Sequence, residues 1–278
     1  MKKIVTAVII TAITVILVVL MTAGGKNAED SIIVAGSTSV QPYAEILVEA
    51  FEILYPGYEV DIQGGGSSAG IRAVEAGTAD IGMSSRPLKA DELEVLNPVV
   101  IAFDGLALVV HPKNPVKNLT LQQIFDIYSG NITNWKEVGG TDAKIYVITR
   151  EEGSGTREAF EKQMEELNGE NIRITSKAIV LNSNGAVKQT VSSGEHFVGF
   201  ISLGLALEKN SGVDAVSIEN VAATEENVAN GSYVLYREFL FVTDGEPEGL
   251  AKRFIDFVLS EKGREILAGE GLIPPPAD

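Results

Sequence analysis

Strand-like and helix-like segments alternate along this chain, and this alternation restricts its fold more than any other feature. The apolar run at residues 32–35 is typical of a buried strand. Apolar side chains at residues 43–54 then recur at the spacing of one helix face, which ends at Pro56-Gly57. Residues 58–62 alternate between polar and apolar and indicate a second strand. Repeated alternation of this kind predicts an α/β fold with parallel sheets.

The same alternation continues towards the C-terminus. The sequence predicts extended segments at residues 98–103 and 106–110, further strands at 145–149 and 197–201, and one long helix over 249–267. A stretch of about 250 such residues without a barrel-like repeat exceeds the common size of one domain. We therefore expect two α/β lobes rather than one domain.

The N-terminal segment has the pattern of a targeting element. Met1-Lys2-Lys3 is basic, and residues 4–21 contain no charge. The small residues that follow suit a signal peptidase, but eighteen apolar residues are also just long enough to span a membrane. We interpret residues 1–23 as a signal peptide or an N-terminal membrane anchor, and residues 24–30 as a linker. Either interpretation places the rest of the chain outside the membrane, periplasmic or on the outer face of the cell membrane, with residues 4–21 as the anchor if it is retained.

Composition excludes several classes of function. The chain has no cysteine, which rules out disulfides, thiolate metal sites and a cysteine nucleophile. Its two histidines, His111 and His196, are too few for an all-histidine metal site. With 22 basic against 38 acidic residues, the net charge is −16, which argues against nucleic-acid binding. We expect no metal and no cofactor.

Three loops of one type follow predicted strands and precede predicted helices. They are Gly36-Ser37-Thr38-Ser39, residues 64–70 with the sequence GGGSSAG, and Gly153-Ser154-Gly155-Thr156. Free backbone N–H groups and the positive end of the helix dipole favour an anion at such a junction. Serine and threonine are also ordinary helix caps, so any single loop could be plain capping. Three such loops together favour a site for an oxyanion, at the carboxyl ends of the strands.

Two arginines stand beside these loops. Arg150 comes just before the third loop, and its donor fork matches phosphate-like groups. It could instead be a surface residue paired with Glu151 or Glu152. A fourth segment ends in Ser85 and Arg86 and is followed by Pro-Leu, which gives another hydroxyl and a second candidate cation.

Taken in order, these four segments resemble the phosphate-binding proteins of ABC importers, a branch of the two-lobed periplasmic-type binding proteins. Residues 120–140 and 147–156 carry the most specific part of the resemblance, which runs from about Ile32 to the C-terminus. It implies a periplasmic-binding-protein-like fold of type II, with the ligand in the cleft between the lobes. It also implies a protein that is no enzyme, captures inorganic phosphate and delivers it to the permease subunits of an ABC transporter.

The resemblance also implies the ligand set. Glu152 stands where the family has an acid that pairs with Arg150, and Ser85 where many members have an aspartate that accepts the proton of hydrogen phosphate. A serine hydroxyl does not repel a fully ionised anion as an aspartate would. The resemblance therefore does not imply that this protein rejects sulfate. Arg86 could add a second cation or pair with an acid such as Asp104. The phosphate ligands implied are Thr38, Ser39, Ser67, Ser85, Arg150, Ser154, Gly155 and Thr156, with Ser37, Arg86 and Glu152 as supporting residues.

The resemblance also divides the chain. We expect lobe 1 to consist of residues 31–105 and 238–278, and lobe 2 of residues 106–237. The chain then crosses between the lobes twice, near residues 104–106 and 236–239.

Three other functions remain open at this stage. The protein could bind another tetrahedral oxyanion, or act as a receptor that uses the same fold without transport. Residues 66–70 also satisfy the G-x-S-x-G pattern of a nucleophile elbow, with Ser68 as nucleophile and His196 downstream. A serine hydrolase has no second supporting feature, and the P-loop pattern is absent from the sequence.

Overall fold

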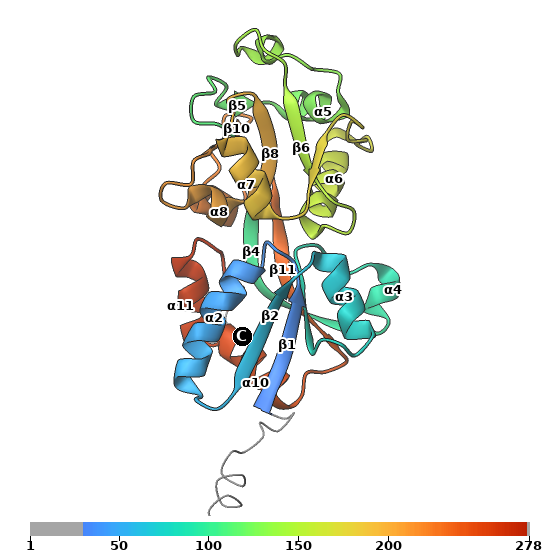
Figure 1. Cartoon of the computed structure of the whole chain (residues 1–278), viewed down its shortest axis with the longest axis vertical. Helices are drawn as coiled ribbons and strands as arrows, with labels where there is room; N and C mark the ends of the chain where they lie inside the picture. The colour runs from blue at the N-terminus through green and yellow to red at the C-terminus, as the bar shows by residue number, and fades with distance from the viewer. Residues whose placement is uncertain (1–29, 277–278) are drawn as a thin grey trace, which may run out of the picture.

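The computed structural model describes residues 30–276, and most of its strands belong to one curled sheet that runs through two lobes (Figure 1). Within these residues the large sheet has nine strands. In spatial order they are β2 (Glu59–Gly64), β1 (Ser31–Gly36), β3 (Ile81–Ser84), β11 (Tyr236–Asp244), β4 (Leu96–Val110), β8 (Phe197–Ser202), β6 (Tyr146–Arg150) and β7 (Ile179–Leu181), and β9 (Asp214–Ala215) pairs with β4. A separate parallel pair is formed by β5 (Asn118–Leu119) and β10 (Ser217–Ile218).

The two ends of the large sheet follow the same plan. In the first lobe, β1 lies parallel to β2 and β3, and β3 is antiparallel to β11. In the second lobe, β6 lies parallel to β7 and β8, and β8 is antiparallel to β4. The long strands β4 and β11 pair antiparallel with each other from Gly105 opposite Tyr236 to Leu96 opposite Asp244. They join the lobes in Figure 1, and we call them the crossover strands.

Helices flank the sheet in both lobes, and four of them begin where a parallel strand ends. The first-lobe helices are α2 (Gln41–Leu54), α3 (Ser67–Glu75), α4 (Ala90–Leu93), α10 (Gly249–Leu259) and α11 (Glu261–Gly269). The second-lobe helices are α5 (Leu121–Ser129), η2 (Trp135–Val138), α6 (Gly155–Asn168), α7 (Asn184–Ser192), α8 (Leu203–Leu207) and α9 (Glu225–Ala229). Because α2, α3, α6 and α7 follow β1, β2, β6 and β7, their N-termini gather at the strand ends that face the other lobe (Figure 1).

Each lobe has its own apolar core. In the second lobe Phe160 stacks on Phe200 with ring centroids 4.4 Å apart, and the buried Trp135 belongs to the same cluster. In the first lobe Phe51 packs edge-on against Phe254 at 5.3 Å. The second-lobe cluster of buried residues draws its members from 106–235, whereas the first-lobe clusters draw theirs from 32–102 and 239–272. Burial of apolar area therefore stabilises each lobe through its own cluster of buried residues.

The structure confirms the α/β class and differs from the sequence expectations in three places. The extended segments on either side of Asp104 form one continuous strand, β4. The expected long C-terminal helix breaks at Ser260, whose hydroxyl accepts from the N–H of Gly263 and begins α11. The sheet is not purely parallel, because β4 and β11 run against their neighbours.

Two further expectations concern the chain's organisation. The lobe boundaries stay predictions. The targeting segment at residues 1–23 and nearly all of the linker lie outside the described residues. Within residues 30–276, none of the helices combines the length and the apolar character needed to span a membrane.

A buried ion pair joins the crossover strands. Arg237 on β11 stands opposite Asp104 on β4 in the ladder. Its Nε and Nη2 donate to Oδ2 of Asp104 at 3.1 and 2.9 Å, and Ser202 Oγ donates to Oδ1 at 2.8 Å. Both charged side chains are at most 1% exposed. Burial raises the pKa of Asp104, and the Arg237 charge opposes that rise.

Removing one member of this pair should be costly. Asp104→Ala leaves the Arg237 charge buried without its partner, so we expect a loss of about 3–5 kcal/mol in the free energy of unfolding. Urea denaturation measures this loss. The matched control is Asp256→Ala, which breaks an exposed ion pair with Lys252 and should change the free energy by no more than about 0.5 kcal/mol. Equal effects of the two substitutions would contradict the prediction.

Candidate anion-binding site

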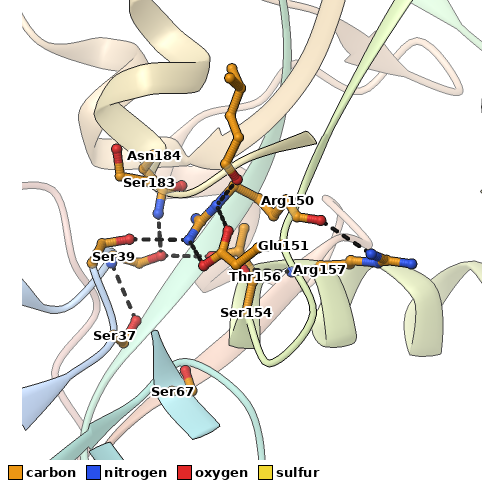
Figure 2. Close-up of polar contacts among 12 residues, drawn as sticks. Ser37, Ser39, Ser67, Arg150, Glu151, Ser154, Thr156, Arg157, Ser183 and Asn184 are labelled. Carbon is orange, nitrogen blue, oxygen red and sulfur yellow. Dashed lines mark hydrogen bonds and ion pairs between the residues drawn. The ribbon is translucent and has the colours of Figure 1, made fainter. Parts of the chain in front are cut away.

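Strand-to-helix junctions from the two lobes face each other across the cleft (Figure 2). In the first lobe, backbone hydrogen bonds hold the start of α3 against the end of β1. Gly65 and Gly66 donate their N–H groups to Gly36 O at 2.8 and 2.9 Å. Gly66 begins α3 with φ at +91°, in the region that favours glycine. Gly70 packs so closely on β1 that a Cβ there would lie 2.3 Å from Ala35 O. These glycines bring the start of α3 against the end of β1.

Three buried hydroxyls of the first lobe come together at these junctions. Ser37 Oγ donates to Ser85 Oγ at 2.9 Å, and Ser67 Oγ lies 3.3 Å from Ser85 Oγ. The N–H of Ser85 donates to Ser67 Oγ at 3.0 Å. Ser37 also accepts the N–H of Ser39 at 3.2 Å, so this N–H is not free to donate into the cleft. The loop after β3, which carries Ser85, therefore contacts the loops after β1 and β2.

Arg150 is the cation of the site. It ends β6, is 1% exposed, and its Nη2 donates across the cleft to Thr38 Oγ1 at 3.3 Å. Its Nε and Nη2 each bond a carboxylate oxygen of Glu151 at 2.8 Å, and Nε also donates to Leu181 O. Nη1 is buried and has no hydrogen-bond partner among the described residues. Since buried donors are nearly always paired, this donor indicates a place for an acceptor.

The acid that pairs with Arg150 is Glu151, and the expected pairing with Glu152 is wrong. Glu152 lies in the exposed turn after β6. Glu151 is held next to the guanidinium because its N–H donates to Leu181 O at 3.2 Å and its own carbonyl accepts the N–H of Ser154 at 3.3 Å. The sequence alone had left both acids open as partners of a surface arginine.

The start of α6 brings the second-lobe donors to the first lobe. Ser154 caps the helix by accepting the N–H of Arg157 at 3.4 Å, which leaves its hydroxyl proton free to donate. Thr156 Oγ1 lies 2.7 Å from Ser39 Oγ of the first lobe. A Cβ on Gly155 would lie 2.2 Å from Ser67 Oγ, so only glycine permits this approach. The predicted ligand residues of both lobes therefore meet.

Arg86 does not join this cluster, and neither of its expected roles is seen. Its Nη1 and Nη2 bond the two carboxylate oxygens of Glu92 at 2.7 and 2.8 Å. Its Nε forms an ion pair across the cleft with Glu158 on α6 at 2.8 Å. Two carboxylates thus take up its charge, and Asp104 is already paired with Arg237. The hydrogen bond from Arg86 lowers the pKa of Glu92 against the effect of burial.

Ser68, the nucleophile of the hydrolase interpretation, is part of the same cross-lobe contact. Its hydroxyl donates to Glu158 Oε1 at 3.4 Å and accepts from Arg86 Nη2 at 3.2 Å. This hydroxyl is thus bonded to a carboxylate and a guanidinium, not to an imidazole. The serine of a nucleophile elbow needs a base within hydrogen-bond reach, and the hydroxyl of Ser68 is not bonded to His196.

Sequence reasoning missed Asn184. It is 1% exposed and begins α7, after the short strand β7 that the periodicity did not predict. Its Nδ2 donates to Ser39 Oγ at 2.6 Å, across the cleft. The available signal was Ser183-Asn184 after the apolar run Ile179–Leu181, since Ser183 caps α7 as Ser154 caps α6.

The chemistry of this cluster is that of hydrogen-bond donation. Glu151 is tied to Arg150, so the charges closest to the hydroxyls are balanced. Within residues 30–276, acids and histidines form no group of three or more that could hold a metal ion. Hydroxyls, backbone N–H groups at helix starts and one guanidinium are suited to a small oxyanion.

Comparison with known proteins agrees with this chemistry. Residues 22–262 match the family model described as a PBP superfamily domain. The phosphate-binding protein PstS of Bacillus subtilis (strain 168) is 32% identical over 257 residues, which cover 90% of this chain and 83% of that protein. The chain belongs to the PstS family of phosphate-binding proteins.

Two solved structures extend the comparison. One, from Clostridium perfringens, holds bound phosphate and is 44% identical, with a TM-score of 0.82 over 88% of this chain and 100% of that chain. An ABC-type phosphate transport receptor from Vibrio cholerae is 40% identical, with a TM-score of 0.72 and the same coverage. The two-lobed fold of type II expected for a PstS protein is therefore confirmed.

The Arg86–Glu92 contact should contribute to acid stability. Because the pKa of Glu92 is lower in the folded state than in the unfolded state, its stabilisation is present above the unfolded pKa. It is lost as the pH falls through the folded pKa. We expect Glu92→Gln to reduce the free energy of unfolding at neutral pH and to converge with wild type at low pH, in urea titrations at several pH values. Glu94→Gln, which removes a nearby exposed acid, is the control; a constant gap between wild type and Glu92→Gln would contradict the prediction.

Proposed function

We propose that this protein captures inorganic phosphate between its lobes and delivers it to the permease subunits of an ABC transporter. The observation that carries the proposal is the buried Arg150, with one unpartnered donor among hydroxyls from both lobes. The names of its PstS relatives and the phosphate bound in the Clostridium perfringens structure support the choice of ligand.

Capture requires that the anion's hydration be replaced by protein donors. Leaving an oxyanion oxygen unpaired in a buried site costs several kcal/mol, on the order of the desolvation penalty for a polar group. The first lobe offers the hydroxyls of Thr38, Ser39, Ser67 and Ser85. The second offers the Arg150 guanidinium and the start of α6, where N–H groups and the helix dipole favour negative charge. Donors from both sides let each lobe bind part of the same ion.

Closure of the lobes would complete the site. The polar contacts that cross the cleft include Arg150 to Thr38, Ser39 to Thr156, and Arg86 to Glu158. These contacts lie outside the apolar cores, so they can form and break without unpacking a lobe. We infer that the lobes open and close by bending at the crossover strands, as in other hinged binding proteins.

Selectivity among oxyanions is open to test at Ser85. This hydroxyl accepts from Ser37 and can donate to an anion, but it carries no charge that repels a fully ionised one. Sulfate is therefore the competitor that matters most. Equal binding of sulfate and phosphate would support the alternative of a less selective oxyanion-binding protein.

Transport, not catalysis, is the role proposed for this site. The hydroxyl of Ser68 is engaged by Glu158 and Arg86, so we assign it no reaction. The permease partners and an exported location, periplasmic or on the outer face of the membrane, are part of the proposal. The membrane would be met only through the N-terminal segment or the permease, and nucleic acid is not an expected partner.

Removal of the cation tests the site directly. Arg150→Met should reduce phosphate affinity by at least about 100-fold, because charge-assisted hydrogen bonds are each worth about 1.5–3 kcal/mol. Isothermal titration calorimetry measures the affinity, with sulfate as competitor. Arg72→Met, at an exposed position on α3, controls for loss of one positive charge. Unchanged affinity in Arg150→Met would refute the site.

A methyl group at Gly155 should block closure. In Gly155→Ala the new carbon would lie 2.2 Å from Ser67 Oγ and 2.6 Å from Ser85 Oγ, so the lobes cannot reach their observed separation. We expect phosphate affinity to fall by at least about tenfold, with a larger radius of gyration by X-ray scattering at saturating phosphate. Gly185→Ala, on α7 where a Cβ would lie 4.0 Å from Ser183 Oγ at ordinary contact distance, should behave as wild type. Tight binding by Gly155→Ala would show that the lobes do not close as described.

A further inference from the structure

The amide of Asn184 has only one possible orientation. The backbone N–H of Ser202 donates to its Oδ1 at 3.3 Å, and a backbone N–H cannot accept. The oxygen must therefore face Ser202, and Nδ2 must face Ser39 Oγ, 2.6 Å away. All three residues are at most 2% exposed.

This orientation determines how Ser39 uses its hydroxyl. Because Ser39 Oγ accepts from Asn184, its own proton is directed elsewhere, and Thr156 Oγ1 lies 2.7 Å away on the opposite lobe. If Ser39 donates to Thr156, then Thr156 in turn directs its proton away from Ser39. In this arrangement donation runs in one direction, from Asn184 through Ser39 to Thr156 (Figure 2). The backbone N–H of Ser202 stands at its start.

We propose that Asn184 is a positioning residue that acts through Ser39 and makes the hydroxyl of Thr156 a donor towards the bound anion. The inference rests on the proposed function, in which Thr156, at the start of α6, binds phosphate. A free hydroxyl can donate or accept with equal ease. An oxyanion oxygen offers only acceptors, so a hydroxyl already turned into a donor binds it without first reorienting.

The residue that begins this chain of hydrogen bonds, Ser202, is itself bonded to a crossover strand. Ser202 ends β8, and its hydroxyl donates to Asp104 Oδ1 at 2.8 Å. Tyr43 of α2 approaches the same hydroxyl at 3.2 Å. The side chain of Ser202 is thus bonded to β4, while its backbone N–H donates to Asn184. Asn184 and Ser39 also line a cavity of about 80 Å³ between the lobes, beside these hydrogen bonds.

A double-mutant cycle distinguishes positioning through Ser39 from a general structural role. Phosphate affinity is measured by calorimetry at pH 8 for wild type, Asn184→Ala, Ser39→Ala and the double variant, and unfolding by urea without phosphate. We expect each single variant to lose about tenfold in affinity, the size of one net hydrogen bond. The double variant should bind within about twofold of Ser39→Ala, because Asn184 has nothing left to orient.

Two further variants sharpen the test. Asn184→Asp keeps an acceptor for Ser202 N–H but gives Ser39 a carboxylate to donate to, so we expect affinity lower than in Asn184→Ala, by about 100-fold from wild type. Burial raises the pKa of a carboxyl group, so at pH 5 a larger fraction of the introduced carboxyl is protonated and can donate, and the ratio to wild type should narrow. Asn114→Ala is the matched control: Asn114 is equally buried and bridges Val116 N and Glu195 O within the second lobe. It should lower stability and leave affinity within about twofold of wild type.

The outcomes separate the two proposals. Additive losses in the double variant, or an Asn184→Asp protein that binds as tightly as Asn184→Ala, would overturn the positioning role while the proposed function stands. If Asn184→Ala does not fold, the comparison of Asn184→Asp with wild type at the two pH values decides the matter. Wild-type protein that binds no phosphate would overturn the proposed function, and the inference with it.

Discussion

Water holds a small oxyanion strongly, and a protein that removes this water must supply donors from every side. This requirement accounts for most of the architecture. Parallel strands bring helix starts to one edge of each lobe, and two such edges facing each other surround an ion with N–H groups and hydroxyls. Arg150 adds a positive charge, and Glu151 balances it. Anion binding therefore depends on groups close to the ion. The net negative charge of the whole chain does not prevent it, because surface charges are screened over about 10 Å.

The cleft is also connected to the strands that join the lobes. Asp104, buried between Arg237 and Ser202, lies at the far end of the hydrogen bonds that pass through Asn184 to Ser39. The same polar groups that hold the crossover strands together thus determine how the cleft presents its donors. Stability at the hinge and donation in the site are parts of one buried network.

Local sequence patterns predicted the class of fold and the loops that begin helices at the cleft, and the resemblance to the family implied most of the residues that meet there. They could not predict what depends on side-chain position in space. The choice of Glu151 over Glu152 follows from a turn held by Leu181, which lies on the neighbouring strand β7. Arg86 finds Glu158 only once the lobes face each other, and no spacing along the chain encodes that contact. Asn184 was overlooked because β7, which positions it, is three residues long and partly exposed.

The path of the chain through β11 bears on how the protein is made. The sheet of the first lobe needs β11 between β3 and β4, and α10 and α11 pack on it from the C-terminal end of the sequence. The second-lobe core, by contrast, comes from one uninterrupted stretch. During vectorial synthesis or secretion, the second lobe can therefore fold while the first lobe, although begun earlier, waits as an incomplete sheet with β3 exposed. Until roughly the last forty residues emerge, that edge lacks its neighbour and is open to pairing with another chain.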